Sequence, residues 1–254
     1  MRNTKRIVLL TVLCVGIAVT AAVGQPLYAV DSSNIGMLRL MDAGSGSDIM
    51  IIGPTMVPHA VGMAMDPTTG IMYLANAVTL FTVNLATGMS TLVGSFPPRN
   101  MMLDLTCDSA GNLYGITDAL SDNWLVQIDK ATGATTDLAD LDGEDNGLAY
   151  NPLDPTYLYH FYGGNAFEKI QIGTWARTPL TVVGTATGPK GLVYNRYANA
   201  CCFFDSLGNF QLLSLAEPLV LVIGTGADDS ANTFGLAFDQ ATTLPVELSA
   251  FSIE

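Results

Sequence analysis

A sequence repeat runs through most of this chain of 254 residues. The segment VNLATGMSTLVG, from Val83 to Gly94, returns with few changes as IDKATGATTDLA from Ile128 to Ala139. Reading outward from this phrase gives five blocks that start at residues 62, 104, 147, 191 and 235, which are 42, 43, 44 and 44 residues apart. Such a period indicates one supersecondary unit that is repeated and buries a core against its neighbours.

Each complete block holds four short apolar runs separated by turn signals. In DPTTG, from Asp66, and DSAGN, from Asp108, the aspartate can accept hydrogen bonds from the backbone ahead of it, while the glycine takes the positive φ of a tight turn. Four strands joined by tight hairpins form an antiparallel meander. A period in the low forties with four strands is typical of a β-propeller blade, whereas the coils of a β-solenoid are much shorter.

The number of blades depends on the two ends of the repeat region. The last block, from Phe234 to Gln240, supplies only a first strand, while LYAVD, GMLRL and DIMIIG near the N-terminus match second, third and fourth strands. We therefore predict an all-β, five-bladed propeller whose ring is closed when strand 234–240 joins the N-terminal blade. Apolar residues make up 49% of the chain and charged residues 13%, as expected for strands covered on both faces.

Two resemblances accompany these patterns. From Leu27 to Gln240, the pattern GLAxDxxGxLY, followed by IDxxTG and TxVG, resembles the blades of secreted bacterial propellers with NHL-type and quinoprotein-like repeats. Such propellers include hydrolases, lyases, lectins and scaffolds, so this resemblance implies the fold and leaves the function open. The segment LPVELSAFSIE, from Leu244, resembles the linker that precedes the sorting domain of type IX secreted proteins.

The N-terminus is typical of a signal peptide. Arg2, Lys5 and Arg6 precede an apolar run, Ile7–Val23, that ends in small residues. A retained membrane anchor is the alternative, since the run is just short of spanning length. We predict a signal peptide over 1–24, a propeller over 25–243 and a tail over 244–254. The expected location is outside, or on the surface of, a Gram-negative bacterium, with no membrane span once the signal peptide is removed.

Charge and cysteine content exclude some partners. Without residues 1–24 the chain has 7 basic and 23 acidic residues, a net charge of −16, so nucleic acid is not an expected partner. Cys107, Cys201 and Cys202 remain. An odd number of cysteines does not indicate a disulfide framework, and no pair of them has metal-ligand spacing. Since all three occupy apolar strand positions, we expect them to be buried.

A propeller commonly binds its ligand at a central mouth, built from loops that lead into first strands and loops that join second to third strands. On the repeat register, the former supply the ligand-binding candidates His59, Arg99, Asn100, Glu144, Asp145, Asn146, Lys190, Asp228, Asp229 and Asn232. The latter add Asp31, Asp118, Asp122, His160, Asn165 and Asp205.

No catalytic residues are predicted. The two histidines, His59 and His160, fall in loops of different blades without a partner at ligand spacing, which excludes a His-rich zinc site and favours surface side chains. No GxSxG elbow occurs. Glu144 and Asp145 resemble the carboxylate pair of a glycosidase, but DLADLDGEDN is more typical of a solvated loop.

Two classes of function follow. The favoured hypothesis is an exported, non-enzymatic and monomeric module that recognises or scaffolds an unidentified protein or glycan, without a cofactor. The alternative is a calcium-dependent hydrolase of the lactonase or phosphotriesterase kind, whose mouth carboxylates hold the ion. A glycan-binding or glycan-cleaving propeller is a third hypothesis, which the presence of only two tryptophans, Trp124 and Trp175, weakens. Any calcium is expected to bind weakly, since its ligands would come from separate loops.

Overall fold

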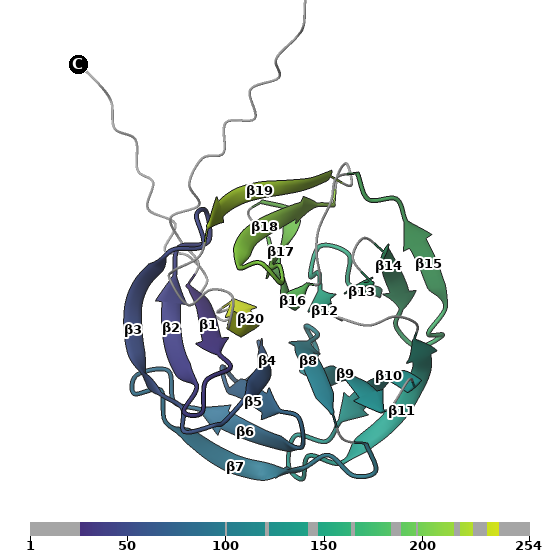
Figure 1. The fold of residues 1–254 in the computed structure, drawn as a ribbon. Coiled ribbons are helices and arrows are strands. Elements are labelled where there is room, and N and C mark those ends of the chain that lie inside the picture. Colours follow the sequence, from purple (N-terminus) through teal and green to yellow (C-terminus); the bar gives the residue numbers. More distant parts are fainter. Residues whose placement is uncertain are drawn as a thin grey trace, which may run out of the picture.

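The computed structural model describes residues 26–99, 101–119, 122–141, 147–163, 166–183, 189–196, 198–215, 219–225 and 233–238. Over these residues the chain forms five four-stranded antiparallel sheets arranged around a central axis (Figure 1). The predicted five-bladed propeller is therefore confirmed. The predicted signal peptide over 1–24 and the tail over 244–254 lie outside the described residues and stay predictions.

We number the blades in chain order. The first blade contains β1 (Leu27–Asp31), β2 (Met37–Met41), β3 (Asp48–Pro54) and β20 (Thr233–Phe238). The second contains β4 (Ala60–Met65), β5 (Met72–Asn76), β6 (Thr79–Val83) and β7 (Ser90–Ser95), and the third β8 (Met102–Cys107), β9 (Leu113–Ala119), β10 (Asp122–Ile128) and β11 (Thr135–Leu141). The fourth contains β12 (Gly147–Tyr150), β13 (Tyr157–Tyr162), β14 (Ala166–Gln171) and β15 (Arg177–Leu180), and the fifth β16 (Lys190–Asn195), β17 (Ala200–Phe204), β18 (Asn209–Ser214) and β19 (Leu219–Thr225).

The ring closes as the repeat predicts. In the first blade, β20 is the innermost strand and pairs antiparallel with β1, with Leu27 opposite Phe238 and Val30 opposite Gly235. This pairing joins the two ends of the repeat region in one sheet and supplies the strand that the N-terminal blade lacks. Closure removes the sheet edge that β1 would otherwise expose to the axis.

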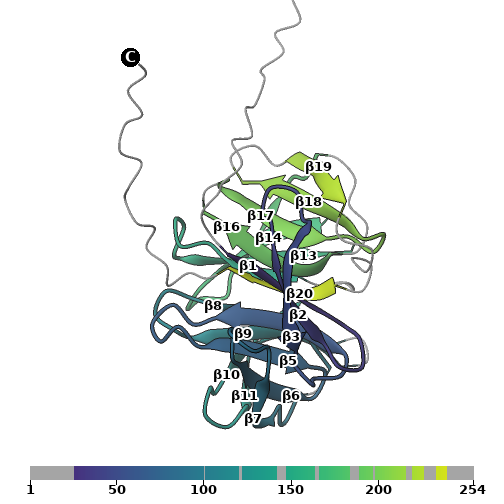
Figure 2. The same ribbon diagram turned by 90° about the vertical axis from the view of Figure 1, so that its left-hand side faces the viewer.

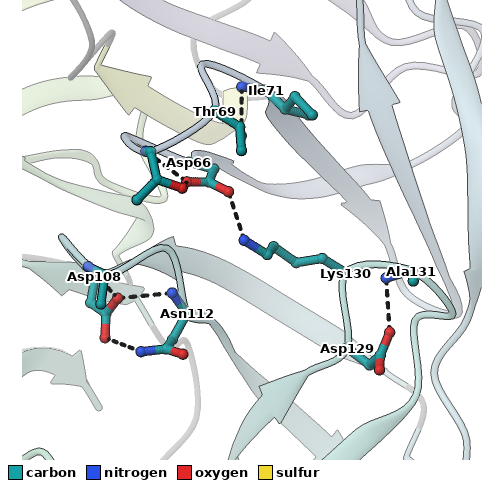
Figure 3. Close-up of polar contacts among 10 residues, drawn as sticks. Asp66, Thr69, Ile71, Asp108, Asn112, Asp129, Lys130 and Ala131 are labelled. Carbon is teal, nitrogen blue, oxygen red and sulfur yellow. Dashed lines mark hydrogen bonds and ion pairs between the residues drawn. The ribbon is translucent and has the colours of Figure 1, made fainter.

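The turns between first and second strands share one device. The side-chain oxygens of Asp66, Asp108 and Asn151 each accept a hydrogen bond from the backbone N–H two residues ahead. Asp108 also accepts hydrogen bonds from the backbone and the side chain of Asn112 (Figure 3). These contacts close the chain reversal locally, as predicted from the DPTTG and DSAGN signals.

The repeated phrase forms a close contact between the first and second blades and between the second and third, which we call the lock. A Cβ added at Gly94, in the strand β7, would lie 1.9 Å from the carbonyl oxygen of Thr132, in the ATG turn of the third blade. Gly53 faces Thr87 in the same way, with a distance of 2.4 Å. The TG turn of one blade thus packs against a glycine in the outermost strand of the blade before it. Both ends of the phrase are therefore contact surfaces, which explains why it recurs.

Hydrogen bonds and an ion pair strengthen this lock between the second and third blades. The backbone N–H and hydroxyl of Thr135 both donate to the carbonyl oxygen of Pro97, at 2.9 and 3.1 Å. Lys130 Nζ lies 2.7 Å from Asp66 Oδ2, so the turns of two blades meet (Figure 3). Burial raises the pKa of Asp66, but hydrogen bonds from Lys130 and Thr68 outweigh it and lower the pKa to about 2.

The core lies between blades. Five apolar clusters of buried side chains each join residues of two neighbouring blades. Figure 2 shows the ring from the side, with strands of the fifth blade such as β17 and β18 above and strands of the second blade such as β5 and β6 below. Cys107, Cys201 and Cys202 are buried and unbridged, which confirms the prediction for all three. Among the described residues, no helix is long and apolar enough to cross a membrane.

The lock can be tested with Gly94→Ala. Because the new methyl group would overlap the carbonyl oxygen of Thr132, we expect the free energy of unfolding to fall by about 1–3 kcal/mol in urea melts. Gly44→Ala is the matched control, since its Cβ would lie 3.3 Å from the nearest atom, Asp42 Oδ1, and we expect a change of less than about 1 kcal/mol. Equal stability of the two variants would contradict the packing described for this turn.

Candidate functional site

The described strand ends that flank the predicted mouth loops lie on one face of the ring, which we call the upper face. It contains the chain ends at which β4 begins and β5 ends, and their equivalents in the other blades. Of the ten ligand-binding candidates, the structure describes His59, Arg99 and Lys190. Seven lie outside the described residues, namely Asn100, Glu144, Asp145, Asn146, Asp228, Asp229 and Asn232.

The three described candidates have different surroundings. His59 is exposed in the turn before β4, with φ at 53°, and its N–H donates to the carbonyl oxygen of Ser33 at 3.1 Å. Lys190 is the first residue of β16 and is half-buried. Arg99 lies over the outer strand of the third blade, where Nε and Nη2 donate to Asp137 at 3.0 and 2.8 Å. The structure thus places the Arg99 side chain on the outer rim.

The Arg99 guanidinium also covers one tryptophan. Its Cζ lies 4.6 Å from the ring centroid of Trp124, which stands in β10. The other tryptophan, Trp175, lies in the hairpin between β14 and β15, with its ring centroid 6.1 Å from that of Tyr114. Both indoles therefore pack against protein groups.

Carboxylates of the other upper-face loops hold their own turns. Asp31 accepts hydrogen bonds from the N–H groups of Ser33 and Met37, and its Oδ2 lies 3.1 Å from Arg39 Nη2. Burial raises the pKa of Asp31, but these hydrogen bonds outweigh it and hold the pKa below its ordinary value. Asp205 accepts hydrogen bonds from the N–H groups of Leu207 and Asn209 and from two side chains.

Three further residues were predicted in the loops that join second to third strands, namely Asp118, Asp122 and Asn165. Asp118 is half-buried at the end of β9, where its N–H donates to the carbonyl oxygen of Met101 at 2.9 Å. Asp122 is the first residue of β10, a strand and not a loop as its place in the repeat suggested. Asn165 lies outside the described residues.

A carboxyl group that the sequence analysis missed lies at the centre of the ring. Five innermost strands, β20, β4, β8, β12 and β16, surround the axis, and β16 also contacts β8 and β4 across it. At one equivalent position in these strands the chain has glycine in four blades and aspartate in the third, namely Gly62, Asp104, Gly147, Gly191 and Gly235. We call this set the glycine ring.

The glycine ring leaves room for one side chain. A Cβ at Gly62 would lie 2.7 Å from Asp104 Cα, and a Cβ at Gly147 would lie 2.7 Å from Leu192 Cβ. Asp104 uses the space that these glycines leave. Its Oδ2 accepts hydrogen bonds from the N–H groups of Leu148 and Leu192, both at 2.9 Å, and its Oδ1 accepts one from Leu105 at 2.8 Å.

Asp104 therefore joins the third, fourth and fifth blades at the axis. The side chain has no exposed surface. This burial raises the pKa of its carboxyl group to about 8, although the three N–H donors act in the opposite direction. The neighbouring cavity among the innermost strands has a volume of about 20 Å³, room for about one water molecule.

A second buried polar group lies between the third and fourth blades. His160 was predicted in a loop and as a surface side chain, and both predictions are wrong: it lies within β13 and is fully buried. Its Nδ1 is 2.9 Å from Glu168 Oε1, and Arg177 Nε donates to both oxygens of Glu168 at 3.0 Å. Burial raises the pKa of Glu168, but these hydrogen bonds outweigh it and hold the pKa below its ordinary value.

Strand register explains this correction. His160 stands opposite Glu168 in the β13–β14 pair, and in the β12–β13 pair it stands opposite Leu148, a core residue. The alternation of YLYHFY and AFEKIQ could have placed both side chains on one buried face. Among the described residues, no group of three or more histidine, cysteine or acidic side chains could hold a metal ion.

Comparisons with known proteins support the fold. No protein-family model matches the chain, and no curated protein sequence does. Among solved structures, it is similar to a chain of a nidogen/laminin complex, with 10% identity, a TM-score of 0.62 and coverage of 86% of this chain and 100% of that one.

Two bacterial structures are also similar. TolB from Acinetobacter baumannii matches with 14% identity and a TM-score of 0.55, over 81% of this chain and 54% of that one. A gluconolactonase from Xanthomonas campestris matches with 14% identity and a TM-score of 0.54, over 80% of this chain and 79% of that one. At these identities the similarities show the propeller fold alone.

The raised pKa of Asp104 gives a testable pH dependence. The folded protein holds this proton more tightly than the unfolded chain, in which the pKa of an aspartate is about 3.9. The group therefore stabilises the fold most at low pH, and its contribution falls by about 1.4 kcal/mol per pH unit as the pH rises towards 8. We expect the stability difference between the wild type and Asp104→Asn to shift by this slope between pH 5 and 8 in urea melts.

Asp31→Asn is the control for this experiment. Because the pKa of Asp31 is lowered, its contribution is already complete at pH 5, and the difference from the wild type should stay constant up to pH 8. Parallel pH profiles of the wild type and Asp104→Asn would contradict the account of Asp104.

Proposed function

We propose that the protein is an exported, non-enzymatic module that recognises or scaffolds a protein or glycan. The observation that carries this proposal lies at the centre of the ring, where the one carboxyl group of the glycine ring is bound by three backbone N–H groups. A carboxyl group with its oxygens bound in this way is poorly placed to hold an ion or to polarise a substrate. Its hydrogen bonds instead join three blades of the ring.

The other described upper-face groups support the same proposal. Asp31 and Asp205 hold turns, and Arg99 is bound to Asp137 on the outer rim. Because these contacts commit side chains to the scaffold, they favour a rigid surface over a reactive pocket. Export is inferred from the sequence of residues 1–24, and the resemblance of the tail to a type IX linker is consistent with it.

One observation favours a hydrolase as the second candidate. An imidazole oriented by a carboxylate is a common arrangement of a general base, and His160 and Glu168 form such a pair, with Arg177 beside the carboxylate. Both side chains of the pair are buried, so a substrate would reach them only if the blade opened. Glu144, Asp145 and Asn146 stand in the segment that follows β11 and contain oxygens of the kind that bind calcium. One similar structure is of a gluconolactonase, though the likeness concerns the fold alone.

Calcium distinguishes the two candidates. If the protein is a recognition module, we expect the same melting temperature in 10 mM calcium chloride and in chelator, and no turnover of lactone, phosphotriester or glycoside substrates. An ion bound with a dissociation constant of about 0.1–1 mM would instead stabilise the fold by roughly 1.4–2.7 kcal/mol at this concentration. Thermal melts of the purified protein resolve such a difference.

Two variants separate a specific ion site from a general effect of charge. Asp145→Asn removes one carboxylate from the segment proposed to bind calcium. Asp129→Asn removes the same charge from a turn of the third blade, where the amide oxygen can still accept hydrogen bonds from Ala131 and Thr132. A calcium shift and turnover that both disappear only in Asp145→Asn would overturn the recognition module in favour of the hydrolase.

A further inference from the structure

A cavity lies between the fourth and fifth blades, away from the axis. It has a volume of about 100 Å³ and is lined by Tyr159, Phe167, Lys169, Leu180, Ser214 and Leu215. The first four residues stand on β13, β14 and β15, whereas Ser214 ends β18 and Leu215 follows it. We call this site the flank groove. No residue predicted for the mouth lines it.

The walls of the flank groove are apolar. The rings of Tyr159 and Phe167 are stacked, with centroids 5.8 Å apart and an angle of 25° between their planes. Leu180 and Leu215 are partly buried and pack against the same core cluster. A cavity of about 150 Å³ with such a lining can hold a benzene ring. At about 100 Å³, the flank groove can thus hold most of one small ring, with the rest of the ring in the opening of the groove.

One wall carries the positive charge of Lys169. Lys169 Nζ lies 4.3 Å from the ring centroid of Tyr157, a cation–π contact. Within the described part of the chain, Lys169 has no carboxylate in salt-bridge range. By contrast, Arg39, Arg99, Lys130 and Arg177 each have a carboxylate partner.

Among the described residues, Lys169 thus differs from these four basic side chains, each of which an acidic group neutralises. An ammonium group beside an apolar wall attracts an anion that can also bury apolar surface. Ser214, on the opposite wall, contributes a hydroxyl group that can donate a hydrogen bond to the same anion. The charge and the lining therefore complement two different parts of one ligand.

We propose that the flank groove binds a small carboxylate with an aromatic or alicyclic ring. The carboxylate lies near Lys169 and Ser214, and the ring lies between the aromatic pair Tyr159–Phe167 and the two leucines. This inference goes beyond the recognition module proposed above, since it names a chemical class of ligand and a site remote from the upper face. It holds whether or not the upper face binds a partner.

Phenylacetate and phenylacetamide are matched probes, because they differ in charge and hardly in shape. In ¹H–¹⁵N spectra of the wild type, we expect phenylacetate to give saturable shifts of the Phe167 and Leu215 amides. Phenylacetamide should bind about tenfold more weakly, as expected when a charge-assisted hydrogen bond is lost. Equal affinities, or no saturable shift with phenylacetate, would overturn the proposal, and this comparison needs no variant to fold.

Lys169→Met tests the charged group directly, since it keeps an apolar stem of similar length. We expect phenylacetate to bind this variant about tenfold more weakly, and the preference over phenylacetamide to disappear. Lys130→Met removes the same charge from the ion pair with Asp66 and should leave both affinities unchanged. If Lys169→Met still prefers phenylacetate, the proposal is wrong.

Discussion

The hydrogen bonds of Asp104 are the interaction on which the centre of this ring depends. The five innermost strands approach so closely that four of them have glycine at one level. The remaining strand, β8, supplies the side chain of Asp104, which fills the space. The carboxyl group satisfies backbone N–H groups of three blades, which would otherwise be buried without acceptors. One buried carboxyl group thus links three blades at the axis.

The rest of the ring is held by repeated contacts. The ATG turns of the second and third blades each pack against a glycine of the preceding blade, and Ser90 and Thr135 donate to carbonyl oxygens of preceding loops. These contacts recur with the sequence period, whereas Asp104 occurs once. The axis is therefore the most constrained part of the propeller, and we infer that its binding functions lie on the faces and the flank.

Much of the fold could be predicted because it rests on local signals. Turn residues fixed the hairpins, and the block spacing fixed the blade number and the closure by β20. Asp104 was missed although the block starts place it among glycines, because its partners stand 44 and 88 residues away and no local pattern marks them. His160 was misplaced because β13 continues to Tyr162, so that this residue pairs with Leu148 and Glu168 inside the sheet, and Arg99 shows that a loop residue can turn outward to a strand.

The central claim is that the carboxyl group of Asp104 binds the N–H groups of Leu148 and Leu192 at the axis. Hydrogen exchange of these two amides in the wild type and in Asp104→Gly tests it most directly, with amides of β13 and β17 as internal controls for overall stability. The account predicts slow exchange in the wild type, and a loss of at least about tenfold protection at Leu148 and Leu192 beyond any change at the controls in the variant. Equal protection of both amides in the two proteins would contradict it.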